Sequence, residues 1–245
     1  MLVLRRRTGQ WRKTGAHAGR PAMVSRRTAR ARGQHAGLTA EAIVATAIRL
    51  ADEEGLPALS MRRLGAELDV EAMALYHHFP NKGALLDAIV EDLATSVPIV
   101  DLAGHGWEDG LRTYARAQLE TLSAHPRLVE LVMSRPAVTT GNLALMESLL
   151  TFLQADEFPP ASALDIVYSL NELVLIHAVL EAGDDTAPGP HGEERWRRHL
   201  AGVSAEDFPL LAEAVEANAD RAAHARFEFA LDALIAGFAD LRRKR

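Results

Sequence analysis

The sequence of 245 residues predicts an all-α protein with a small N-terminal three-helix domain and a larger C-terminal helical domain. Apolar residues recur at spacings of three and four along most of the chain, which is typical of amphipathic helices. We find no run of alternating apolar and polar residues that would indicate a β-strand. Glycine and proline separate the periodic segments, so we expect the helices to be joined by turns and loops.

The composition excludes several classes of protein. The chain has no cysteine, which excludes disulfides, thiolate metal sites and cysteine nucleophiles. No apolar run approaches the about 18 residues that a membrane-spanning helix needs. The basic residues Arg5, Arg6 and Arg7 are not followed by the apolar segment of a secretory signal. We therefore expect a cytoplasmic protein with no membrane partner.

Charge is distributed unevenly along the chain. Residues 1–40 carry nine Arg, one Lys and no acidic residue, a local charge of +10, and because the whole chain carries −6 the remainder carries −16. A basic end on an acidic body suggests that one part meets a polyanion. Residues 1–37 lack helical periodicity, and we predict a disordered basic extension. The alternatives are a merely solvated tail and a true start at Met23.

The first two helices have clear local signals. Thr39 is a suitable N-cap for the first helix, and Gly55 is placed to end it. Ser60 is a suitable N-cap for the second helix, in which Leu64 and Leu68 form an apolar stripe. The second helix should end before a tight corner.

Asp69 is placed at this corner, where the backbone needs a left-handed conformation. A third helix is predicted over residues 71–79, with Leu75 and either Met73 or Ala74 facing inward. Two short helices joined by a tight turn, the second with polar groups facing outward, are typical of a DNA-binding helix-turn-helix. The residues that we expect to face DNA are Ser60, Arg62, Ala72, Met73, Ala74, Tyr76, His77, His78 and Lys82.

Each of these roles has an alternative. Arg62 can bond a guanine edge or a phosphate. Tyr76 either contacts a phosphate or is a core ring with an exposed hydroxyl. The consecutive residues His77 and His78 point apart on a helix and have no accompanying ligand cluster, so no metal is expected.

The rest of the chain predicts further helices separated by proline or glycine. Their expected ranges are 82–95, 107–124, 127–134, 140–155, 161–181, 204–219 and 220–241. Residues 183–203 are rich in Gly and Pro and are predicted to be a mobile loop. The 161–181 helix is apolar on more than one side, so we expect it to be buried between partners.

Two groups of residues resemble a known family. In the first part these are Gly55, Ser60, Leu75-Tyr76, His78-Phe79 and Asn81-Lys82. In the second part they are Trp107, Arg135-Pro136, residues 179–181, residues 209–211 and residues 227–238. The first group resembles the DNA-binding domain of TetR-type repressors, and the second resembles the tetracycline-repressor-like C-terminal domain.

This resemblance implies a homodimeric transcriptional repressor that binds a palindromic operator and is released by a small organic ligand. Residues 38–82 would be the helix-turn-helix DNA-binding domain, and residues 83–245 the ligand-binding and dimerisation domain. We see no nucleophile–base pair and no metal-ligand spacing, so no enzyme activity is expected. The alternatives are an all-α small-molecule-binding protein or enzyme without specific operator binding, and an architectural DNA-binding protein in which the basic extension dominates.

The resemblance also indicates where a ligand would bind. The expected ligand-binding residues are Tyr114, Gln118, Leu131, Met146, Leu149, Val167, Asn171 and His177. At the positions that correspond to the tetracycline-contacting residues of the family, Glu181 alone keeps the family's residue type. We therefore expect neither tetracycline nor a magnesium cofactor, but a moderately apolar organic molecule. Any one of these side chains could instead be ordinary core.

A dimer interface is expected on the 161–181 and 220–241 helices, which would pair with the same helices of a second copy into a four-helix bundle. The residues expected there are Leu164, Val174, Phe227, Leu231, Leu234 and Phe238. The same apolar stripe could equally face the core of its own protomer.

Overall fold

The computed structural model describes residues 38–96, 106–135, 138–182, 199–200, 202–218 and 223–243. Within these ranges all the regular elements are helices and none is a strand, as predicted. The predicted basic extension at residues 1–37 lies outside the described residues, and so does most of the predicted loop at 183–203.

Three helices begin the described chain, at α1 (Ala40–Glu54), α2 (Met61–Glu67) and α3 (Ala72–Leu75). The predicted caps of α1 are confirmed. Thr39 Oγ1 accepts a hydrogen bond from the amide of Ala42 at 3.1 Å. Gly55 ends the helix with φ of 85°, a conformation that costs glycine little because it has no Cβ. Local sequence thus determines where α1 begins and ends.

The fourth helix, α4 (Lys82–Thr95), packs into the same hydrophobic cluster as α1–α3. This N-terminal core also takes in Leu128 and Leu131 from farther along the chain. The N-terminal core contains Ile43, Val44, Ala47, Ile48, Leu50, Ala51, Leu59, Met61, Leu64, Leu75, Phe79, Leu85, Ile89, Val90, Leu93, Leu128 and Leu131. Apolar packing is therefore continuous across Lys82, where the sequence predicts a domain boundary.

The remaining helices form the body of the protein. They are α5 (Trp107–Ala124), α6 (Val129–Ser134), α7 (Thr140–Ala155), α8 (Pro160–Ala182), α10 (Pro209–Ala217) and α11 (Ala223–Arg243). The bounds predicted for α5 and α7 are confirmed. The helix predicted at 127–134 is a 3-10 turn at Pro126–Leu128 followed by α6. The helix predicted to begin at Ser204 begins at Pro209 instead, because Ser204 starts a turn that precedes the helix.

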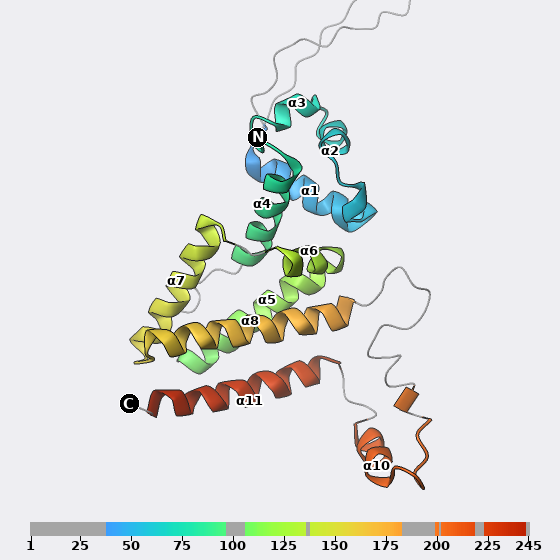
Figure 1. The fold of residues 1–245 in the computed structure, drawn as a ribbon, viewed down its shortest axis with the longest axis vertical. Coiled ribbons are helices and arrows are strands. Elements are labelled where there is room, and N and C mark those ends of the chain that lie inside the picture. The colour runs from blue at the N-terminus through green and yellow to red at the C-terminus, as the bar shows by residue number, and fades with distance from the viewer. Residues whose placement is uncertain are drawn as a thin grey trace, which may run out of the picture. The chain divides into compact units, whose positions relative to one another are not determined.

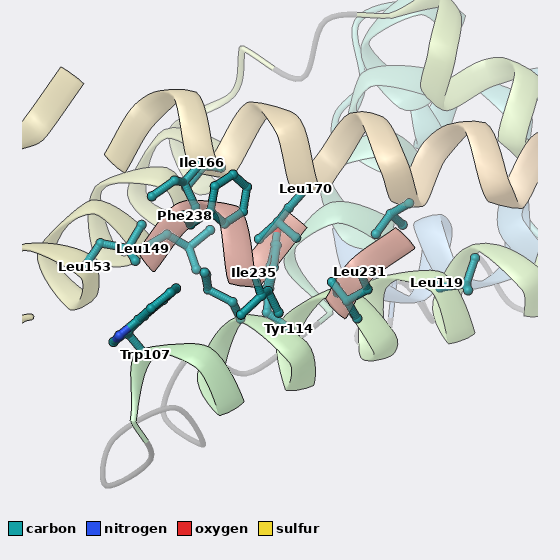
Figure 2. Packing of buried hydrophobic residues seen from close by; sticks show 14 of the residues in the cluster. Trp107, Tyr114, Leu119, Leu149, Leu153, Ile166, Leu170, Leu231, Ile235 and Phe238 are labelled. Carbon is teal, nitrogen blue, oxygen red and sulfur yellow. The ribbon is translucent and has the colours of Figure 1, made fainter. Parts of the chain in front are cut away.

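The long helix α8 is central to the body and packs against α5, α7 and α11 (Figure 1). Its residues Ile166, Leu170 and Val174 are buried in a second cluster, the body core. Figure 2 shows this packing, with Tyr114 of α5 lying among residues of α8 and α11. Among the described helices α8 is long and apolar enough to cross a membrane, a test that the core helix of a folded domain also passes.

Polar contacts join the body to the N-terminal helices. His125 Nδ1 lies 2.7 Å from Asp52 Oδ2, and Arg127 donates to the carbonyl oxygen of Asp52 at 3.0 Å. A cation at the carbonyl end of α1 is favourable because that end carries partial negative charge. The amide of Gly141 at the start of α7 donates to Glu91 Oε1 of α4 at 2.8 Å. These bonds fix α1 and α4 on the body.

Candidate nucleic-acid interface and ligand core

The corner between α2 and α3 has the geometry that the sequence predicts. Ser60 Oγ accepts from the amide of Arg63 at 3.1 Å and caps α2. Asp69 has φ of 54°, in the left-handed region. Val70 then donates to the carbonyl of Gly65 at 2.9 Å, closing the turn. A Cβ on Gly65 would lie 3.0 Å from the Val70 carbonyl oxygen, so the close approach of α2 and α3 favours glycine there.

The third helix is shorter than predicted, ending at Leu75 rather than near Phe79. Leu75 is buried and Ala74 is half-buried, whereas the Met73 side chain is 67% exposed. Ala74 is therefore the inward residue of the two that the sequence left open. Tyr76 is 42% exposed and lies outside the buried core.

Two consecutive arginines on α2 have different surroundings. Arg63 is held by Glu54, whose Oε1 accepts from Nη2 at 2.5 Å, and by Glu67, whose Oε2 accepts from Nη1 at 2.7 Å. These hydrogen bonds raise the pKa of Arg63. Arg62 is exposed and forms no ion pair within the described residues. Arg62 thus differs from Arg63, which joins α2 to α1 through its ion pair with Glu54.

Sequence reasoning missed these ion pairs. Arg63 and Glu67 are four residues apart on α2, a spacing that favours a salt bridge and could have been recognised. The pairing with Glu54 joins α2 to the last turn of α1, and no local pattern predicts it.

The other predicted DNA-facing residues gather near the start of α4. Asn81 Oδ1 accepts from the amide of Ala84 at 2.9 Å and caps α4. Lys82 is the first residue of this helix, whose N-terminus attracts anions such as phosphate. His77 and His78 are exposed between α3 and α4. In the described part of the chain no group of three His, Asp or Glu side chains could hold a metal ion.

Three of the predicted ligand-binding residues lie in or beside the body core: Tyr114 belongs to it, Gln118 is buried on the same helix, and Asn171 of α8 is half-buried. The Tyr114 hydroxyl donates to Asn171 Oδ1 at 2.9 Å, and Gln118 Nε2 donates to the carbonyl oxygen of Ala94 at 2.8 Å. Burial raises the pKa of Tyr114, and hydrogen bonds to Gln118 and Asn171 lower it. Leu149 and Val167 are buried in the same core.

Of the three further predicted residues, one belongs to the N-terminal core, one is half-buried, and one packs against a ring of the body core. Leu131 is buried in the N-terminal core and not in the body core. Met146 is half-buried on α7. His177 lies against the Phe227 ring at 5.2 Å between centroids, with Nε2 3.8 Å from Glu181 Oε1. The predicted set is therefore not a single cluster.

The residues predicted for the dimer interface lie mostly inside their own protomer. Val174, Phe227, Leu231 and Phe238 are buried in the body core, and Leu164 and Leu234 are half-buried. Phe227, Leu231 and Phe238 of α11 pack onto α8 and α5 of the same chain, so they are covered before any partner arrives. The sequence left this alternative open, and packing between sequence-distant helices decides it.

Comparisons with known proteins agree with this geometry. Residues 43–89 match the family model described as bacterial regulatory proteins, tetR family, and residues 101–242 match the tetracyclin repressor-like C-terminal domain. The chain is 32% identical over 214 residues to the Escherichia coli tetracycline repressor protein class C, covering 84% of this chain and 92% of that protein. It is 38% identical to the repressor DrrR1 of Streptomyces coeruleorubidus over 124 residues, which are 50% of this chain and 46% of DrrR1.

Solved structures give the same result for the fold. The crystal structure of the Streptomyces coelicolor TetR family protein ActR in complex with actinorhodin superposes with a TM-score of 0.70 at 27% identity. That match covers 84% of this chain and 98% of ActR. One family model matches the helix-turn-helix and the other matches the helical body. The chain therefore belongs to the TetR family of DNA-binding transcriptional regulators.

Proposed function

We propose that this TetR-family regulator is a repressor that binds a palindromic operator as a homodimer and leaves it when a small organic molecule enters the body core. The observation that carries the DNA-binding part is the free, exposed Arg62 beside the α2–α3 corner. The corner is rigid because Gly65, Asp69 and the Ser60 cap fix it, so Arg62 and α3 are presented in one arrangement. We place this activity in the cytoplasm, where the DNA is.

The exposed face of α3 suggests how bases are read. Met73 is 67% exposed and Ala72 is half-buried, and neither side chain has a hydrogen-bonding group. Such side chains recognise thymine methyl groups by apolar contact in the major groove. Arg62 then supplies the hydrogen-bonded readout of guanine, while Tyr76 and Lys82 bond phosphates and set the register.

The dimer surface of this proposal is the exposed face of α8 and α11. On α8 the apolar residues Tyr168, Ile176 and Leu180 are 51%, 54% and 58% exposed. On α11, Phe229 is 67% exposed, and a Cβ at Gly237 would meet nothing within 4 Å. Two-fold operators match two-fold proteins, so a second copy is the partner that suits this face.

The ligand part of the proposal is supported by the polar groups within the body core. Tyr114, Gln118 and Asn171 give an otherwise apolar core a few hydrogen-bonding groups, the usual composition of a site for an organic molecule. Actinorhodin is the molecule bound in the ActR structure. We propose an organic effector for this chain as well.

The experiment that tests the proposed function is a gel shift with DNA from upstream of the protein's own gene at two salt concentrations. We expect binding that prefers one palindromic fragment over shuffled DNA and weakens steeply with salt, because phosphate contacts release counterions. Deleting residues 1–37 should lower the salt dependence and leave the preference intact. Sequence-blind binding that disappears with this deletion would support the architectural alternative instead.

Substitution of Arg62 tests its role in specificity. Arg62→Ala should weaken operator binding and also relax the preference at one base pair, at a cost of about 1–3 kcal/mol. Arg62→Lys is the matched control, since it keeps the charge and loses the two-pronged bond to guanine. Tyr76→Phe should weaken binding equally on all operator variants. Equal losses on every variant for Arg62→Ala would show that Arg62 contacts only phosphate.

A further inference from the structure

The guanidinium of Arg63 on α2 donates hydrogen bonds to carboxylates from each of its nitrogens. Nη2 donates to Glu54 Oε1 at 2.5 Å and Nε donates to Glu54 Oε2 at 3.3 Å. Nη1 donates to Glu67 Oε2 at 2.7 Å. Two nitrogens on one carboxylate form a bidentate pair, which fixes the orientation of the guanidinium. A phosphate can therefore bind Arg63 only after it displaces a carboxylate.

A second arginine holds Glu67 in place. Arg49 of α1 donates from Nη2 to Glu67 Oε1 at 2.5 Å, so both oxygens of Glu67 are engaged. Nη1 of Arg49 donates to both oxygens of Glu53 at 2.9 Å. The hydrogen bonds from Arg63 and Arg49 lower the pKa of Glu67, so its carboxylate stays charged at neutral pH.

The positions of these carboxylates are unfavourable for the helices that carry them. Glu53 and Glu54 are the last two residues of α1, and Glu67 is the last residue of α2. The carbonyl end of a helix carries partial negative charge, which disfavours an acidic side chain there. Ion pairs at partly exposed positions contribute little to stability. Helix stability by itself therefore does not explain why acidic residues occupy these positions.

Arg63 and its neighbour Arg62 are consecutive on α2, so their side chains point in different directions around the helix. Arg62 is exposed and takes part in no ion pair in the part of the chain that the structure describes, whereas Arg63 is bonded to the last residue of α1. A base contact made by Arg62 would hold the operator complex in an arrangement that does not aim Arg63 at the bases.

A free Arg63 would affect operator and other DNA differently. Phosphate contacts carry no sequence information. On DNA that lacks the operator no base contact fixes the register, so the protein can shift until a free arginine meets a phosphate. A free Arg63 would therefore strengthen binding to other DNA more than binding to the operator.

We propose that Glu54 and Glu67 form an acidic clamp that holds Arg63 away from phosphates and thereby limits binding to DNA without the operator. The two carboxylates are then specificity-determining residues that act through Arg63 and contact no base. Specificity that arises from weakening the wrong complex is as effective as strengthening the right one. This inference rests on the proposed function, because it needs an operator that Arg62 reads.

The test measures the affinity of the full-length protein for two fluorescently labelled duplexes at several salt concentrations by anisotropy. One duplex is an operator selected in vitro, and the other has the same bases in shuffled order. In Glu54→Gln combined with Glu67→Gln, Arg63 loses both carboxylates while Arg49 keeps Glu53. On the shuffled duplex we expect tighter binding and a slope of log affinity against log salt that is steeper by about 0.9 for each DNA-binding unit, the contribution of one phosphate contact. The operator should gain less.

A second background separates the release of Arg63 from the loss of two negative charges, which by itself favours DNA binding. The same two changes are made in Arg63→Met, which has no guanidinium to release. The additional steepening should be absent there. Urea denaturation of each variant reports whether it folds. Glu67→Gln alone frees Nη1 of Arg63 and should show part of the effect if the double variant unfolds.

The outcomes separate this inference from the proposed function. If the wild type prefers no duplex, the proposed function fails. If the wild type prefers the operator but the double variant keeps the wild-type slope on shuffled DNA, the clamp is wrong. Equal gains on both duplexes, or the same gain in Arg63→Met, would also overturn it. A double variant that loses only stability would identify the carboxylates as structural ion pairs.

Discussion

Asp69 holds the corner between α2 and α3 with φ of 54°. For an L-residue this left-handed conformation costs about 1–2 kcal/mol, and Asn and Asp tolerate it because their short polar side chains bond locally. The left-handed conformation of Asp69 and the helix caps Thr39 and Ser60 could be predicted from the sequence, because each depends on the backbone of a few neighbours. The brace of Arg63 by Glu54 could not, since it joins residues of different helices.

At this scale we predict that Asp69→Val destabilises the protein. A β-branched side chain is strained at positive φ, so the free energy of unfolding should fall by about 1–2 kcal/mol. Asp69→Asn is the control and should change it by less than about 0.5 kcal/mol. Urea denaturation of both variants measures the difference. If Asp69→Val unfolds at the same urea concentration as the wild type, the turn must have relaxed to another conformation.

The helices differ in how well the sequence predicts them. The bounds of α5 and α7 are those expected, because Pro126 follows α5, and Thr139 caps α7 by accepting from the amide of Asn142. The third helix is shorter than expected. Its last turn loosens before Phe79, whose ring is buried in the N-terminal core. Burial of the Phe79 ring depends on how the helices of the N-terminal core pack together. Helical periodicity therefore does not predict where α3 ends.

Ion pairs also join helices. The ion pair between α5 and α11 predicts that the stability of the fold depends on pH. Arg116 binds Glu228 through two hydrogen bonds of 2.8 and 2.6 Å. This contact holds the pKa of Glu228 below its usual value of 4.5, so the pair stabilises the fold above that pH. As pH falls through the lowered pKa the carboxylate is protonated and the stabilisation is lost.

Glu228→Gln should therefore lower the free energy of unfolding at neutral pH and have less effect below pH 4.5. The expected loss is under about 1 kcal/mol, because solvent screens a pair whose arginine is 50% exposed. Chemical denaturation across this pH range measures it. Glu147→Gln, an exposed carboxylate without an ion pair among the described residues, is the control. A pH-independent difference would show that Glu228 acts through packing.

At the scale of the whole molecule, the exposed apolar face of α8 and α11 is a larger feature than any single contact. Tyr168, Ile176, Leu180 and Phe229 are more than half exposed, and Gly237 leaves space for another helix to approach. Exposed apolar residues grouped on adjoining helices are typical of a protein interface. The family and the need for two DNA-binding units make a second copy the proposed occupant.

We expect Ile176→Glu combined with Gly237→Arg to convert the proposed dimer into a monomer. Both positions are exposed in the protomer, so thermal stability of the separated chain should change little. Analytical ultracentrifugation would show the change in mass, and operator affinity should fall with it. Ala144→Glu, on the exposed face of α7, should leave both unchanged. A double variant that stays dimeric would place the interface elsewhere.

The sequence by itself determined the class of protein and most helix bounds. These depend on local propensity, caps and the corner at Asp69, all of which act over a few neighbouring residues. Only the tertiary structure decided that Phe227, Leu231 and Phe238 lie in the core of their own protomer, and that Gln118 bonds the end of α4. Helical periodicity shows which residues share a face, whereas the element that covers this face depends on how distant helices pack.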